Sequence, residues 1–110
     1  MKTFASSVIE LRQPFENEVV THPFECGWAD EAVFFVDLHD PAEGTSLDLR
    51  VQLSADGIRW LDEGTRITTS GSAFARVTHF GGFLRLAGSA TDTHGVTTPV
   101  TVSVRLALKG

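Results

Sequence analysis

Four histidines, one cysteine and a short run of carboxylates are the residues of this chain whose types could bind a metal ion. His22 and Cys26 have a spacing at which two zinc ligands occur, but a structural zinc site takes four ligands and the sequence has no second pair. Asp37, Asp40 and Glu43 could offer oxygens to calcium, but an acidic loop that faces solvent accounts for them better. We expect neither a metal nor a cofactor. The other histidines stand alone near expected strand ends or turns: His39, His79 and His94.

Catalysis would need a nucleophile or an acid/base group set against a partner that tunes it. The sequence contains no Gly-x-Ser-x-Gly elbow, no phosphate-binding glycine loop followed by a helix, and no Cys/His pair with a nearby carboxylate. Ser70-Gly71-Ser72 lies in a passage without signature spacing. We therefore predict that the protein is not an enzyme.

The two tryptophans are the aromatic residues that could contact a ligand or partner, because indole offers a large apolar face and one hydrogen-bond donor. Trp60 follows Ile58 by two residues and would share its face of a strand, so we expect Trp60 to pack in the core. Trp28 lies in the looser segment Cys26 to Asp30, where it could either pack or bind.

Composition bounds the class of protein. With 110 residues, 42% of them hydrophobic and 21% charged, the chain fits one globular domain over 1–110. The net charge of −5 and the scattered positive residues argue against nucleic acid as a partner. No apolar run has the length of a signal peptide or of a bilayer span, so we expect a cytoplasmic or virion location and no membrane partner. Cys26 has no second cysteine with which to form an intrachain disulfide.

Alternating apolar and polar residues predict β-strands along the whole chain. The region from Leu47 to Ser54 alternates and then enters the turn Ala55-Asp56-Gly57, which supplies the left-handed backbone of a tight hairpin. Thr65 to Ser72 is rich in Thr, Ser and Gly, and we expect an irregular edge or loop there. Gly81-Gly82 reads as a two-residue turn between paired strands. The predicted strands are Phe4 to Leu11, Glu18 to His22, Glu31 to His39, Leu47 to Ser54, Ile58 to Leu61, Phe74 to Phe80, Phe83 to Ala90 and Val100 to Leu108.

Seven or eight short strands with frequent turns predict an all-β fold, a two-sheet antiparallel sandwich of jelly-roll or immunoglobulin-like type. An up-and-down barrel is the alternative. Phe35 and Val33 place apolar side chains on the second face of their strand, which indicates a central strand or one covered by a partner. The last strands also have small, uncharged outward residues, which suggests a covered face. These residues are Thr101, Ser103, Ala107, Ser89 and Ala87.

The segment Ser54 to Trp60, with Arg85 on a later strand and the closing run Val100 to Leu106, resembles two groups of jelly-roll proteins. One group is the small β-sandwich structural proteins of tailed phages and phage-derived particles. The other is the discoidin-like carbohydrate- and lipid-binding domains, which share Ser-x-Asp-Gly-x-x-Trp and a final Val-rich strand. This chain is shorter than the discoidin pattern and lacks its disulfide pair, so the phage group is the better match.

The phage resemblance implies a non-enzymatic structural protein: a capsid decoration, cement or head-fibre component that forms homo-oligomers and docks on a larger protein shell. Trp28, Phe35 and Arg85 are the residues we expect to contact partners, whereas Asp56, Gly57 and Trp60 are expected to form the turn and core. Two alternatives stay open. One is a carbohydrate-binding module with a glycan as ligand, and the other is an adaptor or cargo protein of a bacterial compartment.

Overall fold

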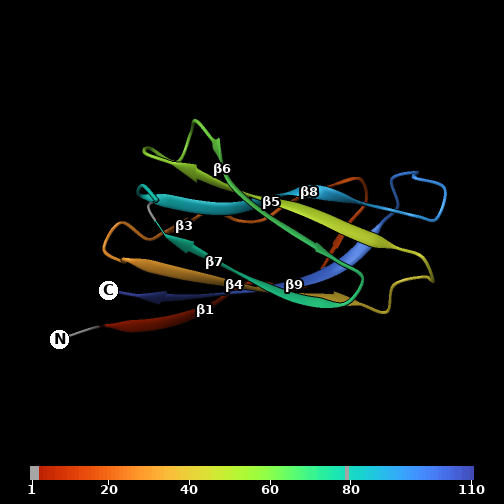
Figure 1. The fold of residues 1–110 in the computed structure, drawn as a ribbon, viewed down its shortest axis with the longest axis horizontal. Coiled ribbons are helices and arrows are strands. Elements are labelled where there is room, and N and C mark those ends of the chain that lie inside the picture. Colours follow the sequence, from red (N-terminus) through yellow and green to blue (C-terminus); the bar gives the residue numbers. More distant parts are fainter. Residues whose placement is uncertain (1–2, 79) are drawn as a thin grey trace.

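The computed structural model describes residues 3–78 and 80–110, which fold into two stacked antiparallel β-sheets (Figure 1). Within these residues there are nine strands, one or two more than the sequence predicts. The predicted all-β sandwich is confirmed. The strands are β1 Phe4–Phe15, β2 Glu18–Val20, β3 Phe24–Glu25, β4 Glu31–His39, β5 Ser46–Ser54, β6 Leu61–Thr69, β7 Ser72–Thr78, β8 Phe83–Thr91 and β9 Val100–Lys109.

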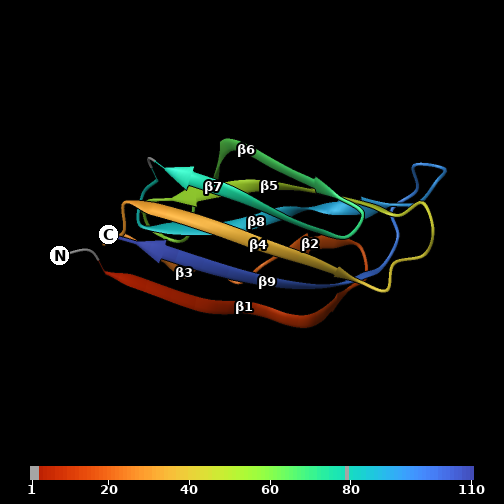
Figure 2. The same cartoon turned by 60° about the horizontal axis from the view of Figure 1, so that its bottom comes forward.

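Each sheet joins strands that are distant in sequence. The first, which we call sheet A, has the order β1-β9-β4-β7, and the second, sheet B, has the order β2-β8-β5-β6 with β3 also paired to β8. Figure 2 shows sheet A as one layer in front of sheet B. The two ends of the described chain meet on one side, where the Gly110 amide donates to the Thr3 carbonyl at 2.9 Å.

The core lies between the sheets and follows from the alternation of apolar residues. In β4, Ala32, Phe34 and Val36 are buried while Glu31 and Phe35 are exposed, which is the period-two pattern of a strand. Strand β9 lies between β1 and β4, so even its small outward residues are largely covered by taller neighbours. The largest fully buried side chains are Phe34, Leu47, Leu49, Leu84, Leu86, Leu106 and Leu108.

Two sequence predictions in the middle of the chain are wrong. Ile58 to Leu61 is not a return strand, because the chain stays in a loop through Trp60 and β6 begins at Leu61. The Thr- and Ser-rich passage from 65 to 72 is not irregular but completes β6 and begins β7. β-branched threonines suit an edge strand that is polar on its outer side, and Ile67 gives β6 its buried contact. The part of the predicted strand that includes His79 lies outside the described residues.

The expected hairpin across Gly81-Gly82 is also wrong. Strand β7 pairs with β4 in sheet A, whereas β8 pairs with β5 and β2 in sheet B, so this connection crosses between the layers. The small residues of β8 and β9 that suggested one covered face therefore lie in different sheets. Ser103, Ala107 and Ala87 are already buried within the described chain.

Strand β1 continues past its predicted end, through Pro14 to Phe15. Proline is tolerated because β1 is at the edge of sheet A and pairs only with β9. Two register shifts interrupt this pairing around Glu10, and Arg12 has a φ of 46°. Bulges of this kind twist an edge strand and discourage pairing with another chain at the edge.

Candidate functional site

Trp28, Phe35 and Arg85, the residues expected to contact partners, lie on three separate surfaces. Phe35 points outward from sheet A, because its neighbours Phe34 and Val36 point into the core. Arg85 points outward from sheet B. Trp28 lies in the loop between β3 and β4, next to Gly110. A single site containing all three does not form.

The outward side of sheet A, which we call the A face, has a mainly apolar row across its four strands, in which Arg105 of β9 is the one charged member. The register places Val8 of β1 opposite Arg105 of β9, Arg105 opposite Phe35 of β4, and Phe35 opposite Phe74 of β7. Residues opposite one another in an antiparallel pair share a face, so these four side chains project together. The rings of Phe35 and Phe74 are 6.3 Å apart between centroids, and the two residues are 45% and 59% exposed.

Charged residues border the apolar row of the A face on both sides. On one side, Asp37 accepts a hydrogen bond from Ser72 at 2.7 Å and forms an ion pair with Arg105 at 3.5 Å. On the other side, the guanidinium of Arg76 lies 5.9 Å from the centre of the Phe74 ring. A depression of about 490 Å³ lies over the row. Its lining is Ser6, Phe35, Asp37, Ser72, Ala73, Phe74 and Arg105.

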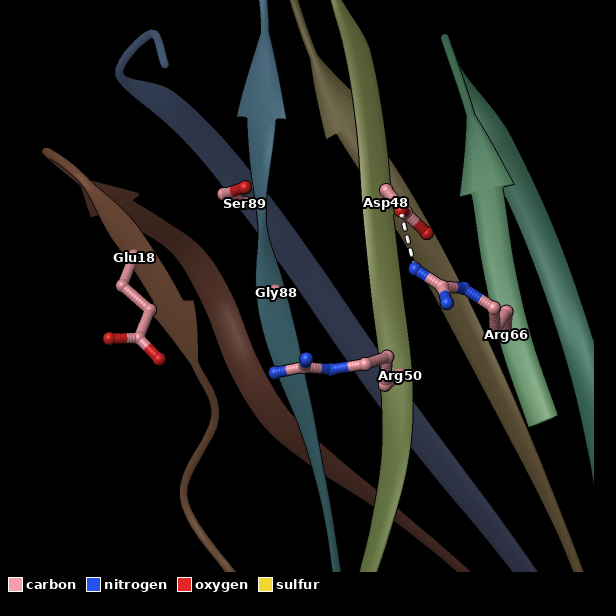
Figure 3. Close-up of a pocket in the computed structure, with 6 residues that line it drawn as sticks. All are labelled: Glu18, Asp48, Arg50, Arg66, Gly88 and Ser89. Carbon is pink, nitrogen blue, oxygen red and sulfur yellow. Dashed lines mark hydrogen bonds and ion pairs between the residues drawn. The ribbon is translucent and has the colours of Figure 1, made fainter. Parts of the chain in front are cut away.

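The outward side of sheet B, the B face, is polar. Arg66 of β6 donates to Asp48 of β5 at 2.9 Å, and Arg50 lies 3.9 Å from Asp62. Figure 3 shows Arg50 extending from β5 over β8 toward Glu18 of β2. This side of the sheet has a depression of about 340 Å³, which is lined by Glu18, Asp48, Arg50, Arg66, Gly88 and Ser89. Charges of both signs line it, so it has no uniform potential that would select an ion of one sign.

The loop between β5 and β6 begins with the turn that the sequence predicts, but its last residues do not form the predicted strand. Gly57 has a φ of 80°, and its amide donates to Ser54 Oγ at 2.8 Å. Asp56 Oδ1 accepts the amides of Arg59 and Ile58 at 3.0 and 2.9 Å. These hydrogen bonds from Arg59 and Ile58, with one from Ser54, lower the pKa of the Asp56 carboxyl. The turn roles of Asp56 and Gly57 therefore have a direct structural basis.

Trp60 is not part of the core, which corrects the sequence prediction. It is half-buried, and the guanidinium of Arg85 lies 4.3 Å from its ring centre. Arg85 also donates from Nε to Gln52 at 2.8 Å. The loop thus folds back over the B face, and Ile58, which was expected to share a buried face with Trp60, is 81% exposed. A longer loop than the predicted tight hairpin explains this change.

The residues considered for metal binding have other surroundings. His22 Nδ1 lies 2.7 Å from a carboxylate oxygen of the buried Glu10, a contact the sequence analysis missed. Cys26 is buried, and its burial followed by the nearby Glu25 charge raises the pKa of the thiol to about 11. A protonated thiol is a poor metal ligand. Among residues 3–78 and 80–110, no three His, Cys, Asp or Glu side chains converge as a metal site.

The sequence analysis also missed Phe74, Val8 and Arg76 as A-face residues. The signal was present for Phe74, since it alternates with the buried residues Ala75 and Val77. This alternation did not point to Phe35 as a neighbour, because β7 was expected to pair with β8. Only the pairing of β7 with β4 brings Phe74 beside Phe35.

Comparison with known proteins relates this chain to solved structures by fold. No protein-family model matches it, and no curated protein matches its sequence. The SPBc2 prophage-derived protein YomS superposes with a TM-score of 0.62 at 9% identity, covering 100% of this chain and 96% of YomS. VP2 of the infectious bursal disease virus subviral particle gives 0.61 at 12% identity over 98% of this chain. The PBSX exported protein XepA gives 0.53 at 6% identity over 98%.

The chain spans nearly all of YomS but only about a third of VP2 and XepA, 32% and 36% respectively. The fold of this chain is therefore that of β-sandwich proteins of prophage and viral origin, which confirms the predicted resemblance to phage β-sandwiches. None of the described segments forms a helix long and apolar enough to cross a membrane.

Proposed function

We propose that this chain is a non-enzymatic structural protein of a phage-type particle, which self-associates and docks on a larger shell as a decoration, cement or head-fibre component. The observation that carries the proposal is the A face. A sheet that faced only water would present polar residues on its outer side, but this one presents Phe35 and Phe74 in its central row.

The fold comparisons support the same class of protein. YomS comes from a prophage and has nearly the same extent as this chain, and VP2 contains this sandwich within a subviral particle. An assembly protein needs surfaces rather than a reactive cleft, and the A face is a surface of that kind. Apolar residues at its centre and charged residues at its border are the usual anatomy of a protein interface.

The carbohydrate-binding alternative has less support from the aromatic residues. Sugar rings stack on an open aromatic face, but one face of Trp60 lies under Arg85. Trp28 is 44% exposed, and it lies on a different surface from Phe35 and Arg85. These residues do not offer neighbouring contacts to one glycan.

The proposed role can be tested in the host that encodes this chain. An epitope tag would be fused to the protein, particles would be separated on a density gradient, and gold-labelled antibody would locate the tag by electron microscopy. We expect the tag to band with particles and the gold to mark their surface. A tag that stays entirely in the soluble fraction while particles band normally would contradict the proposal.

A further inference from the structure

The A face has a pattern that is complementary to itself. Its central row is Val8, Arg105, Phe35 and Phe74. One row toward the start of β4 lies Arg76, opposite Val33, and one row toward the end of β4 lies Asp37, opposite Ser72. Positive and negative side chains therefore flank the apolar row on opposite sides.

Arg76 has no carboxylate partner in the part of the chain that the structure describes. The structure records no ion pair for it within 4 Å among residues 3–78 and 80–110. Its guanidinium instead lies 5.9 Å from the centre of the Phe74 ring. Because Arg76 is exposed, its N–H groups can donate to a carboxylate of a partner. Asp37 is 39% exposed in its side chain, so it can accept a further donor beside Arg105 and Ser72.

We propose that a second copy of this chain packs on the A face, about a two-fold axis that lies in the interface, runs across the strands and passes near the row of Phe35 and Phe74. The inference rests on the proposed structural function and names the surface of self-association. This axis places each residue of the central row against the same residue of the second copy, so Phe74 meets Phe74 and Arg105 meets Arg105. Each Arg105 keeps its ion pair with Asp37 of its own chain at 3.5 Å. It also places Arg76 over Ser72 of the second copy, one strand from Asp37.

The alternative axis, along the strands, gives Arg76 no carboxylate neighbour. It would keep each row opposite the same row of the second copy, so Arg76 would meet the β1 side of the face, where Ser6 lies in its row. The two Asp37 side chains would then share one row. The crosswise axis instead brings Arg76 within one strand spacing of Asp37, about 4.8 Å, which a guanidinium can span.

The size and charge of the A face suit a second copy. Four strands and five rows cover roughly 600 Å² on each copy by ordinary sheet spacings, or roughly 1,200 Å² in total, which is the lower end for a specific interface. The rows contain Arg76, Arg105 and Lys109 against Asp37 and Glu31, a sum of +1 in a chain whose net charge is −5. The contact therefore does not bring two acidic surfaces together.

Sedimentation equilibrium of the purified full chain, from about 1 µM to about 1 mM, tests this contact. We expect a concentration-dependent dimer that Phe74→Glu weakens at least about 10-fold, since the substitution places two carboxylates at the axis. Ile58→Glu is the matched control, because Ile58 is also exposed and lies on the loop between β5 and β6. It should leave the dimer unchanged. Circular dichroism and denaturation midpoints would verify that both variants fold.

A second pair of variants tests the charges. Arg76→Glu and Arg59→Glu change the net charge equally, from −5 to −7, but only Arg76 lies on the A face. We expect Arg76→Glu to weaken the dimer about 10-fold or more, Arg76→Lys to keep most of it, and Arg59→Glu to match the wild type. Equal weakening by Arg76→Glu and Arg59→Glu would overturn the proposed contact.

The experiments can contradict the proposed dimer and the proposed particle role independently of each other. A wild-type chain that stays monomeric at about 1 mM, or a dimer insensitive to Phe74→Glu, would overturn this inference even if the tagged chain bands with particles. In the first case the shell protein would be the remaining occupant of the A face. A Phe74-dependent dimer without particle association would uphold this contact and contradict the particle role.

Discussion

The two outer faces of the sandwich differ in how much of their side-chain chemistry is satisfied within the chain. On the B face, Arg66 pairs with Asp48, Arg85 covers Trp60, and Gln52 links Arg85 to Asp62. On the A face, Phe35 and Phe74 remain exposed and Arg76 forms no recorded ion pair within the described chain. The B-face side chains are thus mostly paired within the fold, although Arg50 Nε is buried without a hydrogen-bond partner among the described residues. The A face instead leaves two aromatic rings exposed.

The largest effect of a glycine substitution should follow a change at Gly88, where β8 approaches β5. A Cβ at this residue would lie 2.0 Å from the Asp48 carbonyl oxygen, and this backbone atom has little freedom to move. We expect Gly88→Ala to lower the free energy of unfolding by about 3 kcal/mol, or to prevent folding, by forcing β8 and β5 apart. Chemical denaturation measures this loss. Gly71→Ala is the control, since no atom would lie within 4 Å of its new Cβ.

The next effect should follow Gly57→Val in the loop that folds over the B face. Gly57 has a φ of 80°, which valine adopts only with strain, and we expect a loss of about 1 to 3 kcal/mol. The new Cβ would meet the Phe83 ring at an ordinary 3.6 Å, so packing adds little to the cost. Gly57→Asn should lose less, because asparagine tolerates left-handed backbone. Equal denaturation midpoints for the valine variant and wild type would contradict this account.

Some elements of the fold could be predicted from the sequence and others could not. Strand β4 was predicted from Glu31 to His39 without error, because Ala32, Phe34 and Val36 alternate with outward residues over its whole length. The turn at Gly57 was predicted because few residues other than glycine adopt its backbone. The strands β6 and β7 were mistaken in part because threonine and serine suit both an edge strand and a loop, and only tertiary pairing decides between them.

The A face shows why a site is harder to predict than a fold. Phe35 could be singled out, since β4 has apolar residues on both faces. Its row, however, depends on the pairing of β4 with β7 and of β9 with β1. The second pairing joins residues up to 105 positions apart, as for Phe4 with Lys109, and places Val8 opposite Arg105. Alternation within one strand gives the face of a residue but not its neighbours on that face.

The stability of Trp60→Ala tests whether Trp60 packs on the surface against Arg85 or belongs to the core. We expect a loss of about 1 kcal/mol, mainly the contact with the Arg85 guanidinium, where a core tryptophan would cost about 3 to 5 kcal/mol. A double-mutant cycle with Arg85→Gln would isolate the stacking contribution from the rest of the loss. A loss of 3 kcal/mol or more by chemical denaturation, on the scale of core truncations, would place Trp60 back among the core residues.

Asp56 should make the stability of this loop depend on pH. Hydrogen bonds lower the pKa of its folded-state carboxyl, so between the folded and unfolded pKa values the unfolded chain binds more protons. The stabilisation is therefore present above the unfolded value near 4 and is lost as pH falls through the folded pKa. Wild type should have a higher denaturation midpoint than Asp56→Asn at pH 7, and the difference should shrink at acid pH. A difference that is constant with pH would contradict this origin.

The smallest effect on folding is expected for Phe74→Ser on the A face. The side chain of Phe74 is 59% exposed, and its contacts with the Phe35 ring and the Arg76 guanidinium lie at the surface. Its removal should therefore change the unfolding free energy of the monomer by no more than about 1 kcal/mol. Phe34 is adjacent to Phe35 in β4 but is fully buried. Phe34→Ala should therefore lower the free energy of unfolding by about 3 to 5 kcal/mol.

Protein concentration completes the comparison of the two faces. If a second copy binds the folded chain on the A face, the wild-type melting temperature should rise with concentration by mass action, whereas that of Phe74→Ser should stay constant. Trp60→Ala should keep the concentration dependence of the wild type, because the contact of Trp60 with Arg85 lies on the B face. Scanning calorimetry at about 10 µM and about 1 mM measures this difference. A concentration dependence lost with Trp60 and kept without Phe74 would reverse the assignment of the two faces.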